Sequence, residues 1–472
     1  VVLIIFGFLA KSGYSPESFK IKVLVNIFIS LFLLYILVYG RFLYDDLVGT
    51  YVETPVPAKE KNFLYIVPAV LGGVVLVPIV VITILNITAI DEQSPYDSDL
   101  ALKKVEISKD QNIAEDLEFL FPYKNANIPK INGETATIID MVNGKMWDSD
   151  AASRFVADNE KFFTWFDQEF PKKLYYQDPA SADPATMSPG SVLPSLNTLR
   201  VMARAESIRA EYLFRDGKEK EAIDESIKII RLGHMITNSQ ATVIDYLVGV
   251  AVKDIGYRRF RILIDRATLS QITLKNYLTI LAQYRDNHAG LKTAMKSEYA
   301  MEKWGIRYVA DTIKDSSDRP EYGLLGPVDL AGYDFSGLFY GGSFYFKPNK
   351  TIRIFADRAR RSIADIDRPC LNSVSNNQEN IWQENSFLYI IQSLFTENFV
   401  GKALSSIVES SFQSLYTKRC STDFSGQSSE LLLALKIYQI ENKILPSDLR
   451  NLILYVPESA LQDPFDGKQI RY

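Results

Sequence analysis

Two long uncharged apolar segments come first in this chain, and amphipathic segments with helical periodicity follow them. Residues 23–40 and 63–90 contain no charged side chain. Each segment approaches or exceeds the roughly 20 residues that cross a bilayer as a helix, so we predict two transmembrane helices within residues 1–90. Residues 1–10 are also apolar and could be the remnant of a third span. The sequence begins with Val1 rather than Met, and we interpret it as a processed form or a fragment.

Charged residues around these segments predict the orientation in the membrane. Three lysines precede residue 23 and three basic residues lie in the loop 41–62, so these two flanks do not differ. After residue 90, four acidic residues occur before the first basic residue, Lys103. By the positive-inside rule, the loop is cytoplasmic and the large C-terminal part is extracytoplasmic. The predicted location is a bacterial inner membrane, and the lipid bilayer is the first expected partner.

A helical hairpin is the clearest unit after the apolar segments, at residues 196–235. Apolar residues from Val201 to Tyr212 step by four, three and four positions, as they do on one face of a helix. Asp216-Gly217 breaks this pattern, and the same stepping resumes from Ile223. The pattern predicts two helices joined by a short turn, similar to one tetratricopeptide unit. No second copy follows about 34 residues later, so the sequence predicts no solenoid.

Further periodic segments make residues 91–429 an irregular, mainly helical extramembrane domain. Residues 243–264 and 291–309 are predicted helices, and Gly290 is predicted to close a helix that ends near His288. Another helix should begin at about Thr351 and stop before Pro369. Its expected inward face consists of Ile352, Ala356, Ala359, Ile363 and Ile366.

Two segments lack helical periodicity. Residues 177–195 are polar and rich in proline, which indicates a connection between elements. Residues 322–350 are rich in glycine and aromatic side chains. Because tyrosine and phenylalanine serve both in packing and at interfaces, this segment is either a packed loop or an aromatic binding surface.

Composition narrows the class of protein only a little. The chain has 472 residues, of which 47% are hydrophobic, and its net charge is −5. Acidic and basic residues nearly balance, so nothing indicates binding to nucleic acid. Cys370 and Cys420 are the only cysteines. They could form one disulfide outside the cytoplasm or remain two thiols.

Few residues suggest chemistry. Phosphate-loop, dinucleotide-binding, zinc-protease and serine-hydrolase motifs do not occur. His234 and His288 each follow an apolar helical face, where a cation near a helix C-terminus is favourable. We therefore predict no catalytic, cofactor-binding or metal-binding residue, and no cofactor.

Glu298 and Glu302 are the best acid-base candidates. They lie four positions apart on one helix face, with no basic residue three or four positions from either. Two such carboxylates could shift each other's pKa or bind a cation. The favoured interpretation is a structural one: either a solvated helix edge, or pairing with an arginine such as Arg358 or Arg360. We interpret the arginines of residues 353–361 as a solvated helix face, because aspartates alternate with them.

The chain ends with an apolar helix and a turn-forming stretch, residues 430–472. Asp466-Gly467 between two short segments predicts a β-hairpin, and Ser447 is the expected cap of a short helix from Asp448. This end resembles the C-terminal module of type II secretion pseudopilins at Leu435, Tyr438, Asn442, Pro446, Leu449, Asp463, Pro464, Phe465, Gly467 and Tyr472. A pseudopilin has no comparable upstream domain, so the resemblance implies a shared local module.

Much of residues 100–472 also resembles a group of uncharacterised bacterial membrane-anchored proteins, through stretches such as "LVGVAVKDIGYRRF" and "KPNKTIRIFADRARRSI". This resemblance implies no activity. The expected fold is mainly α, with two or three N-terminal membrane helices, a helical domain with a TPR-like hairpin, and a short C-terminal β-hairpin.

The expected function is that of a non-catalytic accessory or scaffold subunit that contacts other subunits of a membrane complex. Two alternatives remain open. One is an extracytoplasmic enzyme or metal-binding domain that uses Glu298 and Glu302. The other is a component of a secretion or pilus-like apparatus.

Overall fold

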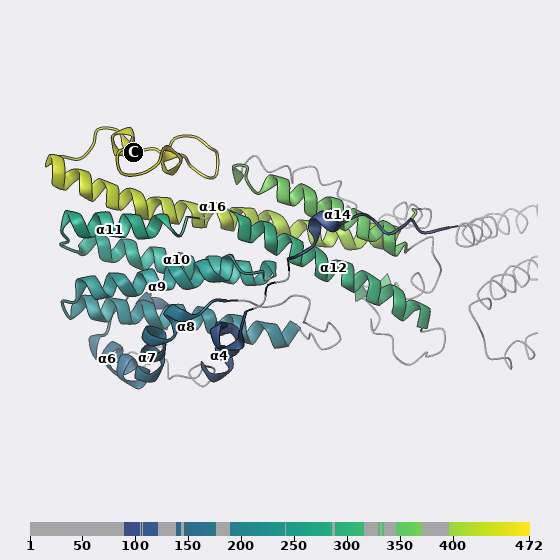
Figure 1. Ribbon diagram of the computed structural model, residues 1–472, viewed down its shortest axis with the longest axis horizontal. Helices are drawn as coiled ribbons and strands as arrows, with labels where there is room; N and C mark the ends of the chain where they lie inside the picture. Colours follow the sequence, from purple (N-terminus) through teal and green to yellow (C-terminus); the bar gives the residue numbers. More distant parts are fainter. Residues whose placement is uncertain are drawn as a thin grey trace, which may run out of the picture. The chain divides into compact units, whose positions relative to one another are not determined.

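The computed structural model is mainly helical, as the sequence predicts (Figure 1). It describes residues 89–120 except 104 and 106, 138–142, 146–175, 189–285 except 241, 288–315, 329–330, 333–334, 346–370 and 396–472. The predicted span 23–40, nearly all of the span 63–90 and most of the aromatic segment 322–350 lie outside the described residues. Within the described ranges, no helix has both the length and the apolar character needed to cross a membrane.

The chain divides into two compact units. The described residues of the first unit are 89–95, 306–315, 329–330, 333–334, 346–354 and 396–405, and all others belong to the second. The elements of the first half of the chain are η1 (Ser98–Leu100), η2 (Lys109–Gln111), α4 (Ile113–Leu120), α5 (Ile138–Val142), α6 (Ser149–Asp158), α7 (Glu160–Gln168), η4 (Phe170–Lys172), α8 (Pro189–Arg215) and α9 (Glu219–Thr237).

The remaining elements contain the longest helices. They are α10 (Val243–Arg266), α11 (Gln271–Ala282), α12 (Ala289–Asp315), β1 (Asp329–Leu330), β2 (Tyr333–Asp334), α14 (Pro348–Asp365), α16 (Phe399–Asn442), η7 (Leu449–Leu452) and η8 (Glu458–Leu461). The strands β1 and β2 are two residues each and pair antiparallel, with Leu330 opposite Tyr333.

Helices α8 and α9 form the predicted helical hairpin. Gly217 adopts a φ of +79° in the turn between them, a conformation that glycine adopts without strain. Helix α10 packs antiparallel on α9 at close range, because a Cβ on Gly233 of α9 would overlap Lys253 of α10. Arg259 of α10 donates to Glu211 of α8 at 2.7 Å with both side chains buried, which ties the third helix to the hairpin.

Two predicted boundaries are wrong. Helix α8 begins at Pro189, so residues 189–195 are helical rather than part of the connection; proline is well suited to a first helical position because its φ is already helical. Helix α11 ends at Ala282, and Gly290 lies in the first turn of α12 instead of closing α11. Gly290 is there because a Cβ would overlap the carbonyl oxygen of Thr237.

The helix predicted from Thr351 corresponds to α14 and has the expected inward face. Ile352, Ala356, Ala359 and Ile366 are buried, and Ile363 packs against buried residues. In the first unit, the carboxylate of Asp91 accepts hydrogen bonds from the backbone of Asn349 at 2.8 Å and of Lys350 at 3.3 Å. It therefore satisfies amide groups in the first turn of α14.

The C-terminal segment folds back onto the end of α16 as a tight turn. Gln462 and Gln469 form a single antiparallel bridge, and Asp463 donates its amide to the carbonyl of Lys468 at 2.7 Å. Gly467 has a φ of +74°, so the predicted Asp-Gly turn is present, with one bridge rather than full strands. The cap of the short helix η7 is Asp448 and not Ser447, because the Asp448 carboxylate accepts from the amide of Arg450.

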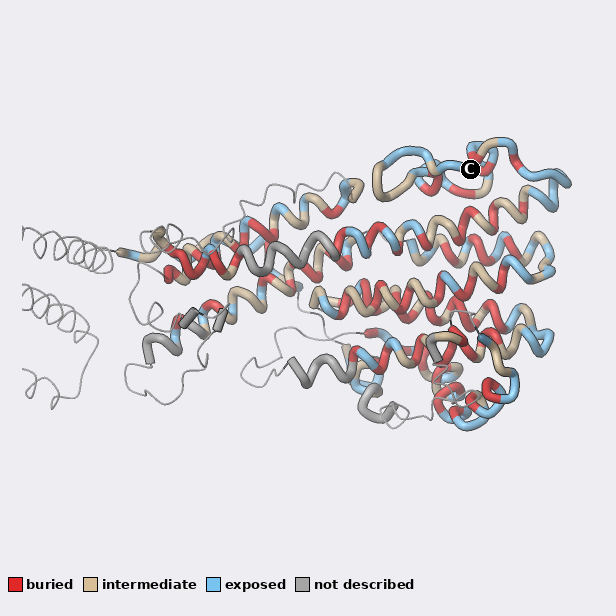
Figure 2. The backbone as a smooth tube through the Cα atoms, turned by 180° about the vertical axis from the view of Figure 1, so that it is seen from behind, coloured by how far each residue is buried: buried red, intermediate tan, exposed pale blue. Residues whose placement is uncertain are grey.

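Apolar residues of this tail belong to a core that also includes α9, α10, α11 and α16. The tail contributes Leu449, Leu452, Val456, Ala460 and Leu461, all of them buried. Figure 2 shows buried residues along the inner faces of the packed helices and exposed ones along the tail and at the helix ends. The tail is therefore part of this core.

Candidate functional site

The two carboxylates singled out from the sequence are buried in the structure. Burial raises the pKa of Glu298, and it raises the pKa of Glu302 to about 7 although Arg358 lowers it. Arg358 of α14 forms an ion pair with Glu302, and its guanidinium lies over the Phe355 ring at 4.2 Å. The pairing with an arginine is therefore present, and the alternative of a solvated edge is wrong because both carboxylates are buried. Arg358 is itself buried, so it does not belong to a solvated face.

The neighbouring arginines of α14 also have acidic partners. Arg360 forms bidentate hydrogen bonds with Asp99, at 2.9 Å each, and these bonds, helped by the charge of Arg360, lower the pKa of Asp99 to about 2. Arg353 pairs with Glu92 at 3.1 Å. These exposed pairs hold the segment before α4 against α14 and are consistent with a structural role.

The two histidines occupy different positions from one another. His234 lies in the last turn of α9, as predicted. The prediction that His288 ends the helix before Gly290 is wrong. His288 directly precedes the first residue of α12 and has a φ of +59°. Its Nδ1 lies 3.3 Å from Asp367 and its Nε2 lies 3.2 Å from Asp423. His288 is thus held between two carboxylates in a conformation that non-glycine residues adopt infrequently.

Cys370 and Cys420 form a disulfide, which decides between the two alternatives left by the sequence. The backbone amide of Cys370 donates to the carbonyl of Pro464 at 3.2 Å. Pro369 lies next to Gly467 of the turn. The disulfide therefore lies where the tail meets the α14 end and α16.

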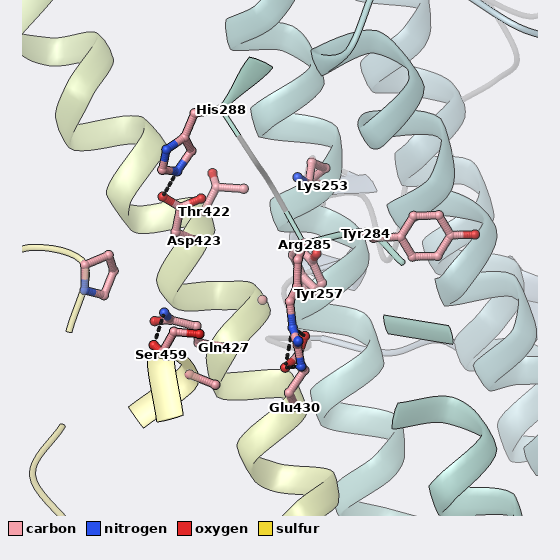
Figure 3. Close-up of a pocket in the computed structure, with 13 residues that line it drawn as sticks. Lys253, Tyr257, Tyr284, Arg285, His288, Thr422, Asp423, Gln427, Glu430 and Ser459 are labelled. Carbon is pink, nitrogen blue, oxygen red and sulfur yellow. Dashed lines mark hydrogen bonds and ion pairs between the residues drawn. The ribbon is translucent and has the colours of Figure 1, made fainter. Parts of the chain in front are cut away.

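A cavity of about 280 Å³ opens beside this junction (Figure 3). Four segments line it: α10, the connection from α11 to α12, α16 and the tail. The lining residues are Lys253, Tyr257, Tyr284, Arg285, His288, Thr422, Asp423, Gly426, Gln427, Glu430, Ser459, Ala460 and Pro464. Sequence reasoning missed this site, since its walls come from segments as far apart as residues 253 and 464.

Charged groups line the cavity in opposite pairs. The Arg285 guanidinium donates to both oxygens of Glu430, at 2.6 to 3.0 Å, and the Glu430 side chain is only 3% exposed. His288 contacts Asp423, which lies about two helical turns before Glu430 on α16. Lys253 lies on the α10 wall and is 2% exposed, and in Figure 3 its amino end faces α16.

One polar atom at the cavity lacks a partner among the described residues. The Gln427 Oε1 atom is buried, and no donor of the described chain lies within hydrogen-bonding distance. The Nε2 atom of the same side chain donates to the carbonyl of Ser459 at 3.3 Å. This bond orients the amide, because the reverse orientation would bring two oxygens together.

A second feature is an exposed apolar surface at the end of the bundle where α11 begins and α16 ends. We call it the end patch and define it as Ile272, Ile440, Ile444, Leu445, Ile453 and Leu454. Glu441 brings its segments together, because its carboxylate bonds to Gln271, Lys275 and Tyr455. Leu454 is 88% exposed and Ile272 is 74% exposed.

A buried acidic cluster lies elsewhere, between α7, α8 and α9. Glu206 is fully buried, and neither of its carboxylate oxygens has a hydrogen-bond partner among the described residues. Burial and the nearby Glu225 raise its pKa well above the ordinary value, although Arg209 and Lys228 oppose this. The sequence contains a signal for this buried carboxylate, because Glu206 lies one helical turn after Met202 and Ala203 on the core-facing side of α8.

No protein family, curated protein or solved structure matches this chain. Among the described residues, no three histidine, cysteine, aspartate or glutamate side chains are arranged to hold a metal ion.

Proposed function

We propose that this protein is a non-catalytic, membrane-anchored accessory subunit whose helical domain binds a partner subunit through the end patch. The end patch is the observation that carries the proposal. Scattered exposed apolar residues are normal on a protein surface, but several of them on segments held together by one residue, as Glu441 holds these, favour an interaction site. Six of the fifteen large hydrophobic side chains exposed in the described residues belong to this one patch.

Two features fit a partner protein at this surface. The patch has the polar rim typical of protein interfaces, because Lys275, Glu441 and Arg450 lie among its apolar residues. Its segments are fixed by the buried core residues Leu449 and Leu452, so a partner would meet a preformed surface.

We propose that the helical domain lies outside the cytoplasm and that the uncharged apolar segments lie in the bacterial inner membrane. The Cys370–Cys420 disulfide supports the location outside the cytoplasm, since disulfides persist in oxidising compartments and are rare in the cytoplasm. It agrees with the orientation that the charged residues around the apolar segments predict.

The proposal is tested by purification of the tagged full-length protein from native membranes. We expect one membrane protein to co-purify in a fixed ratio. The substitution pair I444D/L454D should remove it, because two charges would have to be buried at the interface. The control, K418D, changes an exposed position of α16 away from the patch and should retain the partner. Purification as a lone monomer, or retention of the partner by I444D/L454D, would contradict the proposal.

A further inference from the structure

Three carboxylate oxygens in the acidic cluster between α7, α8 and α9 have no hydrogen-bond donor among the described residues. They are both oxygens of Glu206 and the Oε2 atom of Glu225, and all three are buried from solvent. The Nη1 atom of Arg209 lies 3.8 Å from the Glu206 Oε1 atom, beyond hydrogen-bonding distance. An ionised Glu206 would therefore be costly, because a buried charge needs hydrogen bonds in place of the water that it has lost.

A proton satisfies this arrangement. Because the three oxygens are buried from solvent, a water molecule or a metal ion does not reach them, whereas a proton needs no additional space. A protonated carboxyl group also gains a donor of its own. Burial and the charge of Glu225 raise the pKa of Glu206 well above its ordinary value, although Arg209 and Lys228 oppose this. Glu206 thus keeps its proton at a pH where an exposed glutamate is ionised.

Four charged groups act most strongly on Glu206. They are Asp167 of α7, Arg209 of α8, and Glu225 and Lys228 of α9. With Asp167 and Glu225 ionised, the four charges cancel, and a proton on Glu206 keeps the cluster neutral. The charged residues on the other helices that pack on α8 have other surroundings: Glu115 of α4 and those of α6 are exposed, Asp116 of α4 pairs with Lys173, Asp140 of α5 is half-buried, Arg259 and Arg266 of α10 pair with Glu211, and Lys253 of α10 packs on Gly233.

Arg209 is the group whose position depends on Glu206. Its Nη2 and Nη1 atoms donate to the two oxygens of Asp167, at 2.6 and 3.1 Å, and its guanidinium lies 5.1 Å from the centre of the Phe163 ring. Both partners belong to α7. The same Nη1 atom is the one that lies 3.8 Å from Glu206. Two carboxylates are therefore within reach of one donor, and a neutral Glu206 leaves it to Asp167.

We propose that the proton on Glu206 is a pH switch that controls how tightly α7 is held on α8. While Glu206 is neutral, Arg209 binds both oxygens of Asp167. When Glu206 ionises, the Nη1 atom of Arg209 moves to it, because no closer donor exists among the described residues. Asp167 then keeps Lys228 as its main partner, and α7 opens more often.

The direction of the switch follows from the two carboxyl groups. Burial raises the pKa of Asp167, but the hydrogen bonds from Arg209 and Lys228 outweigh it and lower the pKa below the ordinary value. Asp167 is therefore already ionised in mild acid, where Glu206 is neutral. The attachment of α7 is complete there and weakens as the pH rises through the raised pKa of Glu206. Neither the end patch nor its partner takes part in this switch.

The test measures hydrogen exchange of the α7 backbone amides by mass spectrometry, in the full-length protein in detergent. Exchange is followed from about pH 5 to about pH 10 and corrected for the intrinsic rate at each pH. We expect the protection of α7 in the wild type to fall about 10- to 100-fold, the usual effect of losing a hydrogen bond between charged groups. E206Q should keep α7 protected throughout, because glutamine does not ionise. E221Q, at an exposed position of α9, should behave like the wild type.

Two further variants separate the switch from a general loss of stability. E225Q removes a charge that raises the pKa of Glu206, so the fall in protection should move to lower pH. D167N removes the carboxylate that Arg209 binds on α7, so α7 should exchange rapidly at every pH without a further fall. The amides of α11, which contains none of these residues, should exchange alike in E206Q and the wild type.

The proposal is wrong if the protection of α7 in the wild type does not fall, or if it falls equally in E206Q. It is also wrong if the fall in E225Q moves to higher pH, or if α11 loses protection together with α7, which would indicate global unfolding. If E206Q does not fold, D167N decides, and a fall of wild-type size in D167N would refute the switch.

Discussion

Burial couples the protonation of Glu302 to the stability of the fold. The Glu302 side chain is 11% exposed, and its pKa rises from 4.5 to about 7 because desolvation outweighs the attraction of Arg358. The folded state therefore keeps a proton that the unfolded chain releases. The stability that the protonated form provides is complete below about pH 4.5 and is lost as the pH rises through about 7.

We expect E302Q to remove this dependence, because glutamine resembles the protonated carboxyl and does not ionise. Relative to E302Q, the wild type should lose about 3 kcal/mol of unfolding free energy between about pH 5 and about pH 8. Urea unfolding at both pH values measures this difference. E221Q, at an exposed position of α9, is the control and should track the wild type. A constant difference between E302Q and wild type would show that Glu302 does not titrate in this range.

The sequence anticipates part of this residue-level picture. The four-residue spacing places Glu298 and Glu302 on one face, and Arg358 was an expected partner, as the structure confirms. The side chains around His288 were not predictable. These side chains belong to Asp367 and Asp423. The backbone conformation of His288 depends on where α11 ends, and tertiary contacts decide that end.

At the level of helices, α12 contains two glycines with opposite surroundings. A Cβ on Gly290 would overlap the carbonyl oxygen of Thr237, whereas a Cβ on Gly305 would meet no atom within 4 Å. G290A should therefore destabilise the protein by about 1–3 kcal/mol through overpacking. G305A should stabilise it by up to about 1 kcal/mol, because alanine is the better helix former.

Urea unfolding of the two variants and of the wild type measures both expected changes in unfolding free energy, the decrease in G290A and the increase in G305A. The comparison is matched, since both substitutions add one methyl group to the same helix. Destabilisation by G305A of the size expected for G290A would contradict the packing described for Gly290.

Local patterns predicted helices better than they predicted where helices end. The α8–α9 hairpin followed from periodicity and from Asp216-Gly217, both of which are local signals. The end of α11 at Ala282 depends on the approach of Gly290 to Thr237, which no local pattern records. The cavity could not be predicted for the same reason, because contacts between distant segments create it.

For the molecule as a whole, the tail is joined to the helical core in two ways. Leu452 and Leu461 are buried in the core shared with α9, α10, α11 and α16, and the carbonyl of Pro464 accepts a hydrogen bond from the backbone amide of Cys370 at 3.2 Å. Deleting residues 430–472 would therefore remove core residues as well as the pseudopilin-like surface. The alternative of a secretion-apparatus component is better tested with a substitution at an exposed residue of the resemblance, such as Y472A, than with this deletion.

The disulfide should contribute several kcal/mol to the stability of the described helical core. Cys370 and Cys420 are 50 residues apart in sequence, and closing a loop of this length lowers the entropy of the unfolded chain by the equivalent of about 4 kcal/mol. We expect C370S/C420S to lower the unfolding free energy by about 2–4 kcal/mol in urea. A reducing agent should destabilise the wild type by a similar amount and leave the variant unchanged, since the variant has no disulfide to reduce. Equal stability of the oxidised and reduced wild type would contradict this role.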